Sequence, residues 1–175
     1  MVVAPASGRI WAKADRIWRN GGWDLVDVGI RSAMSTAKGS KRLMSMRLAA
    51  SPDSVRAARD GMKTLRRYLS PQRLDDVRLM VSEITTNCIR HGALPENSQI
   101  SVAVDLEGDI LTVEVSDGGR GFKPHRVPPL PRSSGWGLFL VGRLADSWGM
   151  SSDGSTTVWF QVLARPTTAA DRGPW

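Results

Sequence analysis

The chain has 175 residues, of which 41% are hydrophobic and 23% charged, a composition typical of one globular domain. Its only cysteine, Cys88, excludes an internal disulfide, and the absence of an apolar run of roughly 20 residues excludes a membrane-spanning helix, so we expect a cytoplasmic protein. The net charge of +7 is concentrated in residues 1–50, which hold nine of the 24 basic residues and three of the 17 acidic ones.

The sequence predicts three segments: a basic N-terminal extension at 1–43, a folded domain at 44–164 and a polar C-terminal tail at 165–175. The extension lacks a sustained hydrophobic period, so we expect it to be disordered or to precede the true start of the protein. Met34, Met44 and Met46 leave a later start open. The alternative is a short helical arm around residues 10–19 that docks on the domain or on a partner.

The first half of the folded domain predicts one strand and two helices. Residues 44–50 alternate between apolar and polar side chains and predict a short strand. Ser51 and Pro52 then provide an N-cap and a proline at the first helical position of a helix predicted over 52–69. A second helix is predicted over 72–90, with an apolar stripe formed by Leu74, Val77, Val81, Ile84 and Cys88.

The second half of the domain predicts a hairpin, a glycine-rich turn, a loop, a helix and a strand. They cover residues 99–106 and 109–116, 117–122, 124–134, 138–148 and 156–163, respectively. This order predicts an α+β fold, a two-layer sandwich in which a mixed, mainly antiparallel sheet carries helices on one face.

Glu83 and Asn87 lie one turn apart on the second predicted helix, beside its apolar stripe. Carboxylate and amide oxygens can hold Mg²⁺ directly or through water, and a carboxylate can act as a general base toward a hydroxyl group. The pair is weak evidence by itself, because most exposed Glu and Asn residues at this spacing have no such role.

The glycine-rich turn from Asp117 to Gly121 follows an apolar strand. Its glycines allow the backbone to approach a ligand closely, and a carboxylate at a strand end can accept a hydrogen bond from the amino group of adenine. The spacing excludes both a Walker A element and a Rossmann fingerprint. The alternative is a tight turn with a solvated aspartate.

Gly135-Trp136-Gly137-Leu138 stands between the proline-rich loop and a predicted helix. Glycine amides at a helix N-terminus can bind phosphate groups, and the preceding loop can close over them as a lid. The alternative is a helix entry that only requires small residues.

Taken in order, these motifs and the final strand segment Gly154-Ser-Thr-Thr157 resemble the nucleotide-binding boxes of the GHKL (Bergerat-fold) ATPases. Within that superfamily the chain is most similar to the bacterial anti-sigma factor serine/threonine-protein kinases, because the whole segment from Val81 to Gly92 matches their N box. The resemblance covers residues 44–164 and implies a histidine-kinase-like ATPase fold that binds ATP and Mg²⁺.

The resemblance also implies a role for each site residue. Glu83 is implied as the catalytic base and Asn87 as the Mg²⁺ ligand. Asp117 is implied to bind the adenine amino group. The remaining implied ATP-binding residues shape the base pocket, the lid and the adenine end, and they are Gly119, Gly121, Gly135, Gly137, Leu138 and Thr157. The loop is short and lacks an obvious phosphate-binding lysine, so Arg126 and Arg132 are the alternatives for that role.

At the level of function, the resemblance implies a kinase that regulates transcription by binding a sigma factor and phosphorylating an anti-sigma antagonist. A different class remains open, a protein-binding module that nucleotide tunes without phosphoryl transfer. The resemblance also raises a homodimer as one alternative. We do not expect direct nucleic-acid binding or a membrane partner, although a basic arm that binds DNA in a salt-sensitive manner is a third hypothesis.

Overall fold

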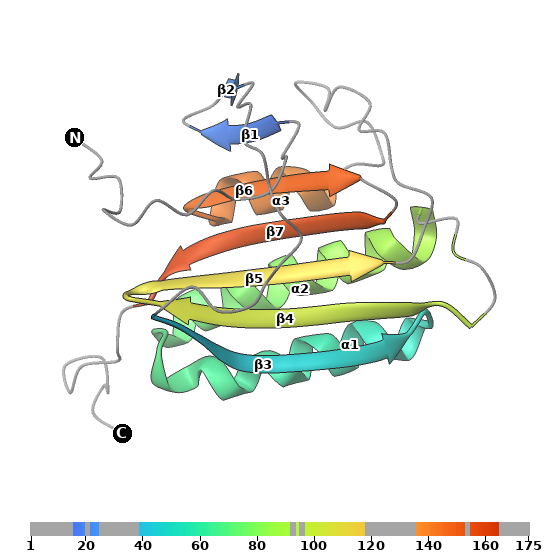
Figure 1. Cartoon of the computed structure of the whole chain (residues 1–175), viewed down its shortest axis with the longest axis horizontal. Helices are drawn as coiled ribbons and strands as arrows, with labels where there is room; N and C mark the ends of the chain where they lie inside the picture. Colours follow the sequence, from blue (N-terminus) through green and yellow to red (C-terminus); the bar gives the residue numbers. More distant parts are fainter. Residues whose placement is uncertain are drawn as a thin grey trace.

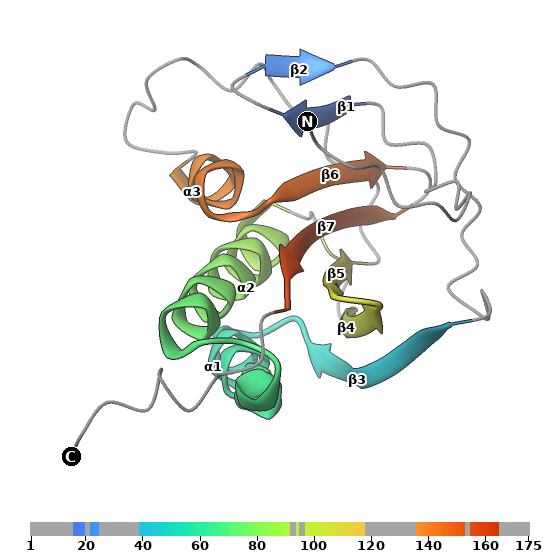
Figure 2. The same cartoon turned by 90° about the vertical axis from the view of Figure 1, so that its left-hand side faces the viewer.

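The computed structural model of the chain describes residues 16–19, 22–24, 39–91, 94, 97–117, 136–152 and 155–164. Seven strands form one sheet, and all the helices lie on one of its faces (Figures 1 and 2). The expected two-layer α+β architecture is confirmed. No helix within the described ranges combines the length and the hydropathy that a membrane span requires.

The strands are β1 (Arg16–Arg19), β2 (Gly22–Asp24), β3 (Ser40–Ala49), β4 (Gln99–Glu107), β5 (Ile110–Asp117), β6 (Ser147–Ser152) and β7 (Thr156–Leu163). The helices are α1 (Pro52–Gly61), the 3₁₀ helix η1 (Met62–Arg67), α2 (Pro71–His91) and α3 (Trp136–Leu144). The sheet order is β2-β1-β6-β7-β5-β4-β3. Each pair of neighbouring strands is antiparallel, so the described part of the sheet has no parallel component.

The hairpin of β4 and β5 contributes fully buried side chains to the core. Glu107 pairs with Ile110, and Gly108 between them has a φ of 54°, a left-handed conformation that glycine adopts without strain. Because side chains alternate along a strand, Val113 and Val115 face the helices and are fully buried. Asp117 continues the same alternation, so the carboxylate at the end of β5 also points toward the helical layer.

The first predicted helix is shorter than expected. Ser51 is the N-cap and Pro52 follows it as predicted, but the α-helix ends at Gly61 and continues as a 3₁₀ turn. A Cβ atom on Gly61 would lie only 2.7 Å from Cε of Met46 in β3. The α-helix therefore packs closely on β3 at Gly61 and then changes to the tighter 3₁₀ form, which is common at helix C-termini.

The predicted helix over 138–148 is wrong in its second half. α3 ends at Leu144, and residues 147–152 form strand β6 between β1 and β7. The physical reason is tertiary: β7 supplies the backbone partners of this segment, and Gly149 leaves room for the indole of Trp159 on the neighbouring strand. Glycine in a strand often marks such a close approach.

The N-terminal segment differs from the predictions at two points. Residues 16–19 form β1, which pairs with β6, so the helical-arm alternative is wrong for these residues. Strand β3 begins at Ser40, four residues before the predicted domain boundary. The described sheet therefore includes backbone from the basic extension.

Candidate functional site

Glu83 and Asn87 lie on the side of helix α2 that faces α3, next to the apolar stripe, as predicted. The core-facing residues Val81, Ile84 and Cys88 are buried, while Glu83 and Asn87 are only partly buried on the adjoining side. The predicted range of this helix is confirmed to within one residue at each end, Pro71 to His91. His91 itself is exposed at the helix end.

Gly137, in the first turn of α3, lies against both of these side chains. A Cβ atom on Gly137 would lie 2.9 Å from Nδ2 of Asn87 and 3.0 Å from Oε2 of Glu83. The structure therefore brings together three predicted site residues that belong to two different helices. The contact requires glycine, because any side chain would displace the two polar groups.

We expect Gly137→Ala to weaken Mg·ATP binding by about 10- to 100-fold, because small displacements of positioned groups have effects of this size. The added methyl group would also lie 3.3 Å from Cβ of Glu83, which is attached directly to the helix backbone, so the melting temperature should fall modestly as well. Titration calorimetry and thermal denaturation measure the two effects. Gly61→Ala is the matched control: its methyl group meets only the flexible ends of Met46 and Met44, away from Glu83 and Asn87, and should leave the affinity for Mg·ATP unchanged.

Asp117 is buried at the end of β5, with a relative exposure of 4%. The backbone N–H of Thr156 donates a hydrogen bond to its Oδ1 atom at 3.4 Å, and these two residues are register partners. Asp117 also interacts with Cys88, the residue that follows Asn87 on α2. The carboxylate thus lies where the C-terminal half of α2 meets the sheet, close to the Glu83 and Asn87 side.

Thr157 does not share the face of Asp117. Its hydroxyl lies 2.8 Å from the Ser116 hydroxyl on the face of the sheet that the helices leave open. Thr156, buried at 5% exposure, occupies the helix-facing position beside Asp117. The structure therefore places Thr156, and not Thr157, next to the carboxylate, because neighbouring residues of a strand point to opposite faces.

The other predicted residues are placed as follows. Leu138 is partly buried and packs against the hydrophobic core, so its side chain serves packing. Gly119, Gly121 and Gly135 lie outside the described residues, as do Arg126 and Arg132.

Cys88 is a buried thiol, as the apolar stripe of α2 predicted. Burial raises the pKa of the Cys88 thiol far above its ordinary value, and the negative charge of Asp117 and hydrogen bonding with it raise the pKa further. The thiol therefore stays protonated in the folded protein. The contact of Cys88 with Asp117 could not be predicted from the sequence, because no local pattern indicates a contact between a helix and a strand end.

We expect Cys88→Ala to reduce the slope with which the free energy of unfolding falls as the pH rises in the alkaline range. The unfolded thiol ionises above about pH 8.5, whereas the folded thiol remains protonated, so stability is present below that pH and is lost as the pH rises. The difference in slope should approach 1.4 kcal/mol per pH unit, about one proton. Urea denaturation across this range measures it. Thr85→Ala, a truncation of a buried, non-titrating side chain on the same helix, should keep the wild-type slope.

The chemistry of the site fits a magnesium-bound nucleotide. Glu83 and Asn87 offer oxygen atoms of the kind that Mg²⁺ prefers. Gly137 brings the N-terminal turn of the nine-residue helix α3 against them, and helix N-termini favour phosphate groups. Asp117 supplies a buried acceptor of the kind that a nucleobase amino group requires.

Comparison with known proteins supports the same chemistry. Residues 48–162 match the family model described as histidine kinase-like ATPase domain. The chain is 28% identical over 130 residues to the serine-protein kinase RsbW of Listeria innocua, covering 66% of this chain and 83% of that protein. It is 30% identical over 120 residues to the anti-sigma F factor of Clostridium acetobutylicum, covering 63% and 84%. It is 25% identical over 114 residues to RsbW of Bacillus cereus, covering 58% and 71%.

Proposed function

The chain belongs to the histidine kinase-like ATPase domain family, and from this premise we propose that it is an ATP-dependent protein serine/threonine kinase. The observation that supports this most directly is the contact of Gly137 with Glu83 and Asn87, which joins a carboxylate, an amide and a helix N-terminus in one place. Such a cluster can position a phosphate group beside a general base.

In the proposed mechanism Glu83 would accept the proton of the attacking hydroxyl group, and Asn87 would hold the metal ion. When bound, Mg·ATP would supply the transferable phosphoryl group, with ADP as the leaving group, and the metal ion would neutralise the phosphate charge. The N-terminal turn of α3 orients the phosphate end through its backbone amides. Gly135 is proposed to bind the phosphate groups as well.

At the other end of the site, Asp117 is proposed to accept a hydrogen bond from the adenine amino group. The N–H of Thr156 donates to Oδ1 of this carboxylate, and the Cys88 thiol on α2 also interacts with it, so the strand and the helix together fix its position. Gly119 and Gly121 are proposed to shape the base pocket next to it. Thr156 replaces Thr157 as the proposed support from the last strand, because it faces the same side as the carboxylate.

The proposed protein partners follow from the names of the relatives. One is an anti-sigma F factor and others are serine-protein kinases. We propose that this chain also binds a sigma factor and transfers phosphate to a serine or threonine of an antagonist protein. Both proposed partners are inferred from the similarity to these relatives.

A nucleotide-tuned binding module without phosphoryl transfer is the competing function. The residues proposed to bind nucleotide support this function as well as the kinase. The two functions differ only in whether Glu83 acts as a general base for phosphoryl transfer. The two functions separate in one experiment on the full chain.

The purified protein is incubated with radiolabelled Mg·ATP and with candidate antagonist proteins recovered by pull-down from the native host. Transfer of label to a serine or threonine of a recovered protein supports the kinase. Saturable ATP binding without transfer to a recovered partner supports the module instead. Failure to bind ATP contradicts both functions.

A further inference from the structure

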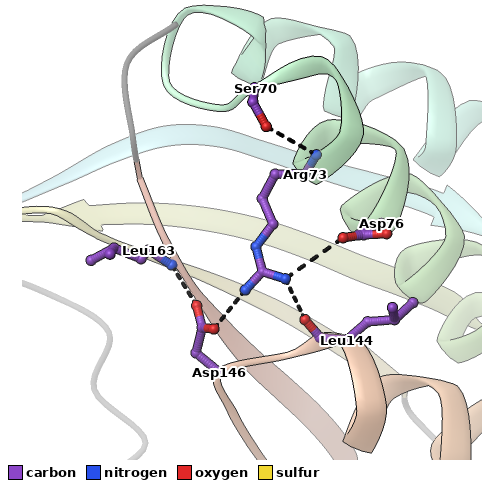
Figure 3. A network of polar contacts seen from close by, with 6 residues as sticks. All are labelled: Ser70, Arg73, Asp76, Leu144, Asp146 and Leu163. Atoms are coloured by element: carbon purple, nitrogen blue, oxygen red, sulfur yellow. Dashed lines mark hydrogen bonds and ion pairs between the residues drawn. The ribbon is translucent and has the colours of Figure 1, made fainter. Parts of the chain in front are cut away.

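The Arg73 side chain joins helix α2 to the end of α3 and to the connection that follows α3 (Figure 3). Arg73 lies in the first turn of α2, and its Nη1 donates a hydrogen bond to the carbonyl oxygen of Leu144 at 2.5 Å. Its Nη2 lies 2.7 Å from Oδ1 of Asp146, in the connection between α3 and β6. Asp76 on α2 adds a longer ion pair at 3.6 Å. One guanidinium group therefore ties the end of α3 to α2.

Asp146 extends this connection to the last strand. Its Oδ2 accepts a hydrogen bond from the N–H of Leu163 at 2.7 Å (Figure 3). Its own N–H donates to the carbonyl oxygen of Gln161 at 3.0 Å. The Arg73 side chain is only 24% exposed. A partly buried, forked guanidinium with several acceptors holds its geometry better than an exposed lysine or a single ion pair.

Helix α3, which ends at Leu144, carries the candidate site residue Gly137 in its first turn. Leu144 follows Gly137 by seven residues, which corresponds to about 10 Å along a helix axis. Glu83 and Asn87 meet α3 near its start, and Arg73 meets it at its end, so α3 runs antiparallel to α2. Helix α3 therefore has a contact with α2 at each end, in addition to the packing of Val141 in the core, and Arg73 supplies one of these end contacts.

We infer that Arg73 is a positioning residue: by holding the C-terminal end of α3 on α2, it sets where Gly137 lies against Glu83 and Asn87. The expected effect of Arg73 on phosphoryl transfer rests on the proposed kinase function. The expected effect of Arg73 on the position of α3 is independent of that function. The experiment therefore measures the position of the helix and the rate of transfer separately.

Other ion pairs of the helical layer offer a matched control. Arg56 and Asp60 pair within α1 at 3.9 Å, so they connect one turn of a helix with the next and not two elements. The Arg56 side chain is 83% exposed. Arg56→Gln removes the same charge as Arg73→Gln, but it leaves the ends of α3 untouched.

The position of α3 is measured between nitroxide labels introduced as Leu79→Cys on α2 and Phe139→Cys on α3, which replace exposed side chains. The native Cys88 is buried, and single-label samples check that it does not react. We expect Arg73→Gln and Asp146→Asn to shift or broaden the distance distribution in the full chain, with and without Mg·ATP. Arg56→Gln should leave it as in the wild type.

For phosphoryl transfer, we expect Arg73→Gln to lower kcat by about 10- to 100-fold and to raise the KM for Mg·ATP, because a shift of Gly137 misplaces Glu83 together with Asn87, the proposed metal ligand. Asp146→Asn should act in the same direction, and the double variant should add little, since both remove one connection. Arg73→Lys should recover only part of the rate, because an ammonium lacks the guanidinium fork.

An unchanged distance distribution in both Arg73→Gln and Asp146→Asn overturns the inference, whatever the activity. A normal kcat combined with lower thermal stability also overturns it, because Arg73 then serves stability alone. If Arg73→Gln does not fold, Asp146→Asn decides by the same two measurements. Absence of transfer in the wild type contradicts the proposed kinase function, while the distance measurement still tests the role of Arg73.

Discussion

Glu83→Gln is expected to lower the rate of phosphoryl transfer by about 10²- to 10⁴-fold, the range that general-base catalysis contributes. The substitution keeps the shape of the side chain and its contact with Gly137 but removes the group that accepts a proton. Binding of Mg·ATP should change much less, because Asp117 and the α3 turn remain in place. Initial rates with radiolabelled ATP and titration calorimetry measure the two quantities on the same preparation.

Glu114→Gln is the matched control for this experiment. Glu114 lies on the open face of the sheet, on the same strand as Asp117 but on the opposite side from the helices. Its substitution should leave the transfer rate within about twofold of the wild type, the ordinary result for a residue outside the site. A Glu83→Gln protein that transfers phosphate at the wild-type rate would remove Glu83 from the catalytic role.

Asp117→Asn is expected to weaken ATP binding by about 10- to 100-fold, the value of one hydrogen bond to a charged group. Asparagine keeps the size of the side chain, so the fold should survive. It replaces one acceptor oxygen by an amide donor, which opposes the amino group of adenine. Thermal-shift titration with ATP measures the loss, and unchanged stabilisation by nucleotide would exclude Asp117 from the pocket.

Nucleotide choice provides a second test of the same residue. The wild type should prefer ATP over inosine triphosphate, which lacks the amino group, and Asp117→Asn should lose that preference. Asp53→Asn, a substitution at an exposed position in the first turn of α1, is the matched control and should keep the wild-type preference. Loss of preference in both variants would point to a general effect on the protein and not to base recognition.

Short-range patterns in the sequence predicted the helices and strands that depend on local chemistry. The range of α2 follows from an apolar stripe with a period of 3.6 residues. The hairpin of β4 and β5 follows from alternation around Gly108, whose left-handed φ suits glycine. The start of α1 follows from Ser51 and Pro52. Each of these signals is complete within one segment, so no tertiary information was needed.

The predictions failed where a partner distant in the chain decides the outcome. Residues 147 and 148 were predicted as helix, yet they belong to β6 because β7 and β1 pair with it. A local pattern cannot show this, since Trp148 and Met150 are apolar residues that suit either kind of element. The N-terminal residues 16–19 joined the same sheet edge for the same reason.

The sequence by itself determined the fold class and the family, and it predicted the residue types of the candidate site, because Glu83, Asn87 and Asp117 belong to motifs that can be recognised along the chain. Only the tertiary structure decided which side chains meet. The register of β5 on β7 selected Thr156 over Thr157 across 39 residues of sequence. The packing of α3 on α2 brought Gly137 to Glu83 and Arg73 to Leu144. These contacts depend on strand register and helix packing, which act between segments and leave no local mark in the sequence.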